Sequence, residues 1–258
     1  METLSAVARV ARPPRAVRAH EVDERPLPAE VIALELAVQE REDPAEFPPP
    51  PDWAVVVRLM GEPCAESREG VRAVFAKKRS LELLCWMVLN RDRSTRSAAR
   101  TAMWDLDVAD STFSTVVSEM RRSLGRVTPA LSAADASPLT YGDTLPLSDQ
   151  VVTDVELLEQ AVAAARGDSS AIDQVVSALS LVRDVPFAGT AYQWADLDGS
   201  TTRIIISVMR AVDFVLEEGR YMSRPDLVLA GTRAGLRVMP GDERLLALQE
   251  SLAATLWT

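Results

Sequence analysis

The sequence has a single histidine and only two cysteines, and these low counts exclude several kinds of active site. His20 lies in a Pro- and Arg-rich N-terminal stretch, where we expect no packed neighbours to hold the imidazole base that Ser-His-Asp or Cys-His catalysis requires. Cys64 and Cys85 show no CxxC spacing, whereas zinc ligands normally occur in clusters. We therefore predict a protein that is not an enzyme and that binds no metal.

Glycine and long apolar runs are also scarce. Among the 11 glycines, neither GxGxxG nor GxxxxGK followed by Ser or Thr occurs, so we expect no nucleotide cofactor. Apolar runs such as residues 204–206 are far shorter than the roughly 20 residues of a membrane span. Residues 1–20 lack the apolar core of a signal peptide, and two cysteines without a pairing pattern fit a reducing compartment. We expect a cytoplasmic protein without membrane insertion.

The net charge of −10 is unevenly distributed along the 258 residues. Residues 1–52 carry −5 and residues 153–258 carry −6, whereas residues 53–152 carry +1. Within the middle part, residues 77–126 contain ten bases and six acids. Clustered positive charge is what a nucleic-acid-binding surface requires, although a solvated helix face produces the same pattern.

Composition divides the chain into three parts. Residues 1–52 are rich in Pro, Arg and acids, end in a proline run at 48–51, and are predicted to be a disordered tail with one short helix at 29–41. In residues 53–150 we predict a strand at 53–60, a hairpin partner at 70–75, and a second hairpin at 139–147 around a Gly-Asp turn. Between them, apolar spacing and capping residues predict helices at 77–89, 95–104 and 111–124.

Residues 151–258 show only helical patterns after Asp154. Short spacers that contain Gly or Pro separate the expected helices, and such links favour stacked antiparallel helix pairs. Leu236 and Pro240 fit a tetratricopeptide (TPR) pattern, but Thr232 occupies a position where that pattern usually has a large aromatic residue. The expected helices lie at 155–165, 170–182, 199–219, 225–238 and 242–256.

Two groups of segments carry a family resemblance. The first group, KKRSLELL at 77–84, MW at 103–104 and VSEMRRSLG at 117–125, resembles the winged-helix domain of actinobacterial SARP-type regulators. The second group resembles the TPR-like bacterial transcriptional activator domain that follows it in those proteins, and consists of DVELL at 154–158, PFAG at 186–189, WA at 194–195 and GLRVMPGDERL at 235–245. The resemblance covers about residues 54–256, and the same domain pair resembles the C-terminal part of LysM-containing multidomain proteins.

The resemblance implies a mainly α fold with a small β component, in which a winged helix-turn-helix at 53–150 precedes a TPR-like domain at 151–258. It implies a transcriptional regulator that binds double-stranded DNA through the winged helix. The second domain would then form a homodimer or contact RNA polymerase or another protein. The helix at 111–124 would enter the major groove, and the expected DNA-binding residues are Ser111, Ser114, Thr115, Ser118, Arg121, Arg122 and Arg96.

One departure from the family pattern supports a second interpretation. A DNA-reading wing usually carries Arg or Lys, but residues 139–147 contain no base and include Asp143. A fold can persist after its activity is lost. The alternative is therefore a protein–protein interaction module whose winged helix no longer binds DNA.

Overall fold

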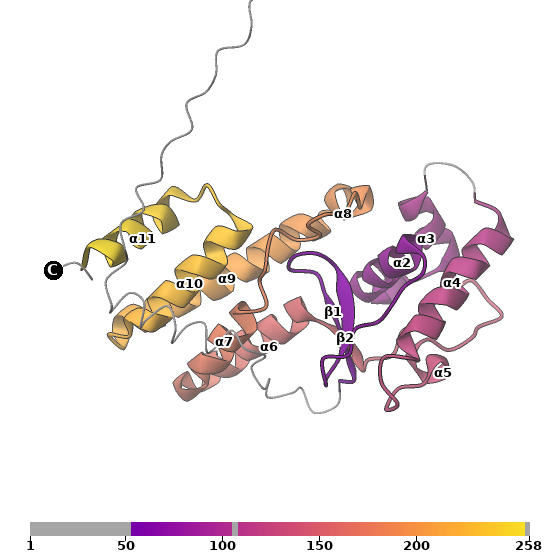
Figure 1. Cartoon of the computed structure of the whole chain (residues 1–258), viewed down its shortest axis with the longest axis horizontal. Helices are drawn as coiled ribbons and strands as arrows, with labels where there is room; N and C mark the ends of the chain where they lie inside the picture. Colours follow the sequence, from indigo (N-terminus) through magenta and orange to yellow (C-terminus); the bar gives the residue numbers. More distant parts are fainter. Residues whose placement is uncertain (1–52, 105–107, 256–258) are drawn as a thin grey trace, which may run out of the picture.

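The computed structural model describes residues 53–104 and 108–255 of the chain. The tail at 1–52, with its expected helix at 29–41, lies outside the described residues. The described part is elongated, with a small sheet near its middle, helices α2 to α5 towards one end and helices α6 to α11 towards the other (Figure 1). The expected mainly helical fold with a small β component is confirmed.

The sheet consists of β1 (Val55–Arg58), β2 (Cys64–Ser67) and β3 (Val151–Thr153), in the order β2-β1-β3. β1 is antiparallel to β2 and parallel to β3. The three valines of β1 are all buried, which fits a central strand covered on both faces. The strand expected at 53–60 is confirmed as β1.

The expected hairpin partner of β1 at 70–75 is wrong, because β2 takes that place. The chain turns back through residues 59–63, where Gly61 adopts a φ of 138° that side-chain-bearing residues rarely adopt. This early turn pairs Arg58 with Cys64. The segment after β2 forms an isolated bridge between Arg72 and Glu66, with backbone hydrogen bonds from Ser67 to Val71 and from Ala73 to Ala65.

Three helices follow β2 and match the sequence expectation. They are α2 (Lys78–Leu89), α3 (Arg96–Met103) and α4 (Asp110–Leu124). Thr95 caps α3 by accepting a hydrogen bond from the backbone N–H of Ala98 at 3.1 Å, as the sequence predicts. α4 begins one residue earlier than expected, after Ala109 in the N-cap position. α2 and α4 pack against each other through buried apolar side chains, and the short helix α5 (Ala133–Ala136) lies beside α4.

The hairpin expected at 139–147 is wrong. This segment contains no paired strands, and it forms an isolated antiparallel bridge between Thr144 and Thr95. The backbone N–H of Leu145 donates to the carbonyl of Ser94 at 2.8 Å, which fixes the segment to the start of α3. The loop therefore pairs with the chain before α3 instead of with itself.

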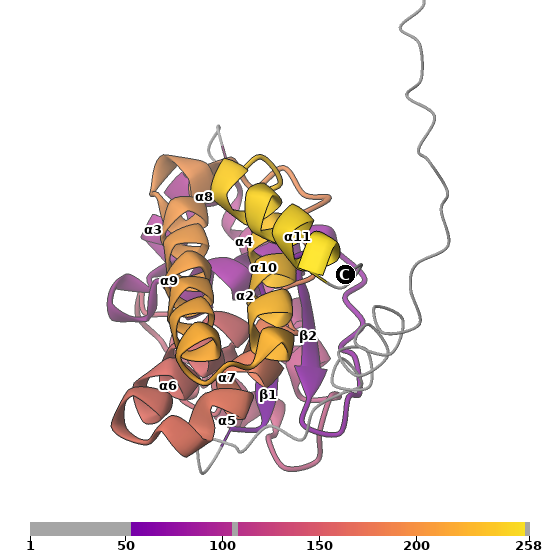
Figure 2. The same ribbon diagram turned by 90° about the vertical axis from the view of Figure 1, so that its left-hand side faces the viewer.

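The second half consists of helices, of which α6 and α7 pack on each other and also on α9. α6 packs on α7, α9 on α10 and α10 on α11, and α9 and α10 run side by side in both views (Figures 1 and 2). The helix expected at 170–182 is shorter than predicted, and α8 was not predicted at all. The bounds are α6 (Asp154–Gly167), α7 (Ile172–Leu179), α8 (Gln193–Leu197), α9 (Ser200–Tyr221), α10 (Pro225–Val238) and α11 (Glu243–Thr255).

One hydrophobic core runs through both halves of the described chain. It extends from Ala54 in front of β1, through Leu84 and Phe113, to Val212 and Leu245 in the last helices. β3 leads directly into α6, whose capping box is formed by Thr153 and Glu156. The helical half thus continues from a strand of the central sheet.

Candidate nucleic-acid interface

The surface of α4 divides into a buried and an exposed face. Phe113, Val116, Val117 and Met120 are buried against the core. The expected stripe of polar residues lies on the other side of the helix and is solvent-exposed. Its members are Ser111, Ser114, Thr115, Ser118 and Arg122. The structure therefore brings these five expected residues onto one accessible face.

Arg96 approaches this face from α3. Its Nη2 donates a hydrogen bond to Ser114 Oγ at 2.8 Å, and its guanidinium carbon lies 5.0 Å from the ring centroid of Phe113. A planar guanidinium both stacks on aromatic rings and hydrogen-bonds polar groups, so this position suits arginine better than lysine. The guanidinium of Arg96 and the hydroxyl of Ser114 thus place several hydrogen-bond donors side by side on the α3–α4 surface.

Arg100 lies one helical turn after Arg96 and was not among the expected residues. Its guanidinium carbon lies 4.9 Å from the Phe113 centroid, and Nη2 pairs with the carboxylate of Asp110 at the start of α4. The i, i+4 spacing of the two arginines on α3 is the sequence signal that identifies this neighbour. Because Asp110 neutralises it, Arg100 contributes less positive charge to the surface than Arg96.

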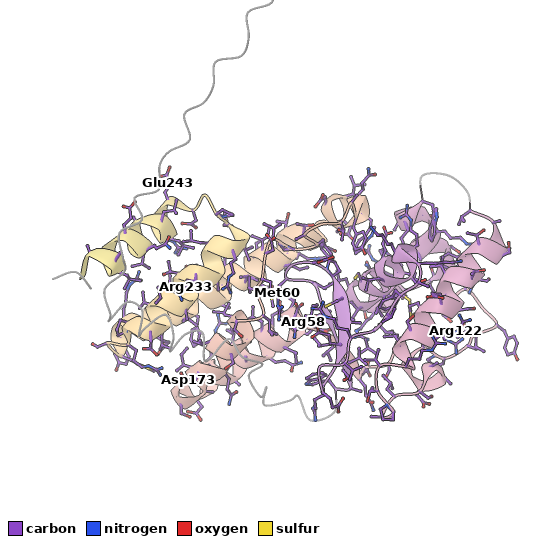
Figure 3. The ribbon with its side chains drawn as sticks, in the orientation of Figure 1. Arg58, Met60, Arg122, Asp173, Arg233 and Glu243 are labelled. Atoms are coloured by element: carbon purple, nitrogen blue, oxygen red, sulfur yellow. The ribbon has the colours of Figure 1, made fainter. Side chains whose placement is uncertain are left out.

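The two arginines at the end of α4 occupy different environments. The side chain of Arg122 is 58% exposed, and its Nη1 lies 3.6 Å from Oε2 of Glu119. Oε1 of Glu119 accepts a hydrogen bond from the backbone N–H of Ala76 at 2.8 Å. Figure 3 shows Arg122 at the end of the molecule remote from α10 and α11. Arg121 is half-buried, and its Nε has no hydrogen-bond partner among the described residues. Arg122 is therefore the expected arginine that is accessible to a ligand.

Asp143, the acidic residue of the loop at 139–147, binds the start of α3. Asp143 accepts hydrogen bonds from the backbone N–H of Ser97 at 3.1 Å and from the Ser97 hydroxyl at 2.6 Å, at the N-terminus of α3. The hydrogen bond from Ser97 lowers the pKa of Asp143. A carboxylate at a helix N-terminus is stabilising, since the N–H groups there lack intrahelical partners. Asp143 thus stabilises α3.

The same loop exposes apolar side chains next to this cap. Leu139 is 81% exposed and Tyr141 is fully exposed. A loop that presents a leucine and a tyrosine, with no base, differs from a wing that neutralises phosphate.

The described residues contain two free cysteines, Cys64 and Cys85. No cluster of three or more His, Cys, Asp or Glu side chains is present among residues 53–104 and 108–255. Burial and, second to it, the negative charge of Glu66 raise the pKa of the Cys64 thiol to about 11, so at neutral pH Cys64 is the thiol and not the reactive thiolate. Cys85 is buried in α2, as expected for a core residue. None of the described helices is long and apolar enough to span a lipid bilayer.

Comparisons with known proteins find similarity at the level of structure only. No protein-family model matches the chain, and no curated protein matches it. EmbR of Mycobacterium tuberculosis, whose structure was determined in complex with a low-affinity phosphopeptide, is similar to 78% of this chain with a TM-score of 0.41 and 16% identity. The match covers 59% of the EmbR chain. A likeness at this level assigns no function to the present chain.

Proposed function

We propose that the protein is a transcriptional regulator that binds double-stranded DNA through α4 and its neighbour α3. The observation that supports this proposal is the exposed stripe on α4, opposite a fully buried face and ending at Arg122. An amphipathic helix of this kind, held by two others, is the arrangement of the helix-turn-helix unit. The SARP-type resemblance of residues 77–125 agrees with it.

The chemistry of the stripe suits a nucleic-acid backbone and base edges. Hydroxyl groups at 111, 114, 115 and 118 donate to phosphate oxygens or to base acceptors. Arg122, which is 58% exposed, would exchange its ion pair with Glu119 for a phosphate oxygen or for a bidentate contact with guanine. Arg96, positioned by Phe113, supplies a second charge beside Ser114. The helical half α6 to α11 would then mediate dimerisation or contact RNA polymerase or another protein.

Binding to DNA is tested by fluorescence anisotropy with genomic fragments over a salt series from about 50 to 200 mM. We expect Arg122→Ala to weaken binding several-fold and to reduce the salt dependence by about one released counterion. Arg220→Ala, which removes one exposed arginine at the end of α9, is the matched control and leaves binding unchanged. Absence of binding at about 50 mM salt, or equal losses in the two variants, rules out this proposal.

The alternative is a protein-interaction module, and the loop at 139–147 supports it. Leu139 is 81% exposed and Tyr141 is fully exposed, while the loop contains no base and its Asp143 binds the N-terminus of α3. The test is affinity capture with the nuclease-treated full chain. A stoichiometric partner that is retained by the wild type and lost from Tyr141→Ser supports this alternative, and its recovery with both proteins contradicts it.

A further inference from the structure

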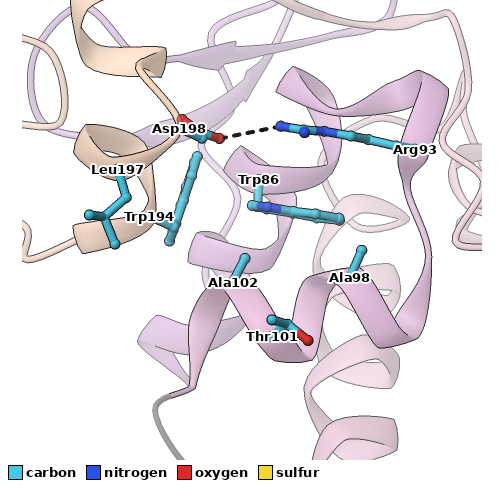
Figure 4. A pocket seen from close by; sticks show the side chains of 8 residues that line it. All are labelled: Trp86, Arg93, Ala98, Thr101, Ala102, Trp194, Leu197 and Asp198. Carbon is cyan, nitrogen blue, oxygen red and sulfur yellow. Dashed lines mark ion pairs between the residues drawn. The ribbon is translucent and has the colours of Figure 1, made fainter.

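The bases at the two ends of α2 differ in whether an acid neutralises them. After the C-terminal end, Arg91 Nε lies 3.8 Å from Glu156 Oε1, and Arg93 Nη2 lies 3.7 Å from Asp198 Oδ2 (dashed line in Figure 4). The second of these ion pairs lies in the wall of a pocket between α2, α3 and α8. Both arginines are therefore paired with acids of the helical half and add little positive charge to the surface.

Lys77 and Lys78, at the start of α2, are the only lysines in the sequence. Both are exposed, and neither forms an ion pair with an acid in residues 53–104 or 108–255. The next residue, Arg79, is by contrast paired with Glu82 at 2.7 Å. The two lysines thus carry positive charge that the described part of the fold does not neutralise.

The segment that carries the lysines runs along the C-terminal half of α4. The backbone N–H of Ala76 donates to Glu119 Oε1 at 2.8 Å, and Ser123 Oγ donates to the carbonyl of Val74 at 2.9 Å. Glu119 also pairs with Arg122, the last member of the exposed stripe on α4. The lysine segment is therefore fixed beside that end of the stripe.

The stripe has a basic segment on each of its two sides. Successive residues of an α-helix are about 100° apart around its axis, so Glu119 lies to one side of the stripe and Asp110 to the other. The lysine segment binds Glu119, whereas α3 binds Asp110 through Arg100 and Ser114 through Arg96. The lysines and Arg96 consequently lie on opposite flanks of α4.

A helix in the major groove of DNA has one phosphate backbone on each side. The groove is about 12 Å wide, and a helix with its side chains is about 10–12 Å in diameter, so each flank of the helix faces one of the two strands. Contacts with phosphates supply most of the affinity that does not depend on base sequence. Positive charge on both flanks therefore suits α4 to this position.

We infer that Lys77 and Lys78 bind phosphates of one DNA strand at one edge of the major groove, while Arg96 binds the other strand at the opposite edge. This inference rests on the proposed function and adds α2 to the helices that contact DNA. A lysine ammonium group is a compact charge with three donors on a flexible stem, which suits phosphate oxygens better than the planar edges of bases. The two lysines thus contribute affinity without sequence preference.

Charge variants test this inference by fluorescence anisotropy with two duplexes of unrelated sequence, over about 50 to 200 mM salt. We expect Lys77→Gln/Lys78→Gln to weaken binding about tenfold for both duplexes, and to reduce the slope of log K against log salt concentration by about two. Lys77→Arg/Lys78→Arg keeps both charges and should bind like the wild type. Arg210→Gln/Arg220→Gln, which removes two exposed arginines from α9, is the matched control and should keep the wild-type slope.

The outcomes separate this inference from the proposed function. A wild-type slope for Lys77→Gln/Lys78→Gln, or an equal loss in the α9 control, overturns the inference. The proposed function stands in that case if Arg122→Ala still weakens binding. A loss confined to one duplex also overturns the inference, because it assigns the lysines to base edges. Absence of binding by the wild type at about 50 mM salt overturns both.

Lysine acetylation of the wild-type chain gives a second measurement that does not depend on the folding of a variant. Because the sequence contains no other lysine, acetylation of lysine side chains by an N-hydroxysuccinimide ester reports on this pair alone. We expect a saturating duplex to slow acetylation of both lysines about tenfold at about 50 mM salt, and to have no effect at about 1 M, where the duplex dissociates. Equal rates with and without the bound duplex overturn the inference.

Discussion

The carboxylate of Asp154, at the first residue of α6, binds the backbone N–H of Leu59 at the end of β1. Its two oxygens lie 2.9 and 3.0 Å from the Leu59 nitrogen, and one of them also accepts the N–H of Met60 at 3.1 Å. Met60 and Arg58 lie at the middle of the molecule, between the two helical groups (Figure 3). A fully buried carboxylate thus terminates the central strand and connects it to the helical half.

Asp154 is expected to make stability depend on pH. Burial raises its pKa to about 6, although the N–H groups of Leu59 and Met60 act in the opposite direction. Since the pKa in the folded state is above that of the unfolded chain, the folded state binds more protons between about pH 4 and pH 6. The stabilising contribution of the protonated group is complete below that range and is lost as the pH rises through about 6. Urea unfolding at several pH values measures this decrease.

Asp154→Ala tests the same connection without titration. The N–H groups of Leu59 and Met60 lose their acceptors, and we expect the free energy of unfolding to fall by about 1–3 kcal/mol at pH 7. The variant also loses the part of the pH dependence that wild type shows between about pH 4 and pH 6. Asp149→Ala, in an exposed position of the preceding loop, is the control. Identical pH profiles for wild type and Asp154→Ala would contradict the assignment.

The position of Gly125 at the end of α4 requires glycine because α5 packs closely against it, and not because the backbone is left-handed there. Its φ is −68°, but an added Cβ would lie 2.6 Å from the backbone nitrogen of Ala133 in α5. Since that neighbour is main chain and cannot move freely, Gly125→Ala is expected to destabilise the fold by about 1–3 kcal/mol. The measurement is the midpoint of urea unfolding at unchanged slope.

Gly142→Ala is the matched control for Gly125→Ala. No atom lies within 4 Å of its added Cβ, so its effect should remain within about 0.5 kcal/mol. An equal decrease in the free energy of unfolding of the two variants would show that backbone flexibility, and not the contact with α5, accounts for the effect.

Asp143 is expected to protect the amide hydrogens in the first turn of α3 from exchange with solvent. In Asp143→Ala the backbone N–H of Ser97 loses its carboxylate acceptor, so its amide hydrogen should exchange faster than in wild type. The pKa of Asp143 is lowered by the hydrogen bond from Ser97, so in wild type this protection is present at neutral pH and is lost as the pH falls through that lowered pKa. Exchange measured by NMR, with α10 amides as the internal reference, tests both statements. Unchanged exchange at Ser97 would contradict them.

Thr232 in α10 explains one departure from the TPR pattern. Its side chain is fully buried, and its hydroxyl donates to the carbonyl of Val228 at 2.7 Å. A large aromatic residue has no space at this position, so we expect Thr232→Phe to lower the free energy of unfolding by about 1–3 kcal/mol. Thr232→Ser keeps the hydroxyl in a smaller side chain, so its free energy of unfolding should decrease less than that of Thr232→Phe. Thermal unfolding followed by circular dichroism compares the two, and a more stable Thr232→Phe protein would contradict this explanation.

Helices with a strong apolar period could be predicted from sequence within one or two residues, and the candidate site could be predicted in part. α2, α4 and α10 begin and end near their expected positions, because side chains three and four residues apart share one face wherever the helix packs. The exposed stripe on α4 follows from the same periodicity. The partner of Arg96 did not follow from it, since α3 and α4 meet at an angle that only their packing fixes.

The sequence by itself determined the helical periodicity, the buried face of α4, the strand at β1 and the absence of phosphate-binding glycine motifs. Only the tertiary structure decided the partners of that strand, the fixing of Asp143 onto α3, and the meeting of α2, α3 and α8 around the pocket. The physical reason is the distance along the chain. Periodicity and capping act over a few residues, whereas Trp86 and Trp194, or Leu59 and Asp154, come together only because burial of the shared core outweighs the entropy of closing long loops.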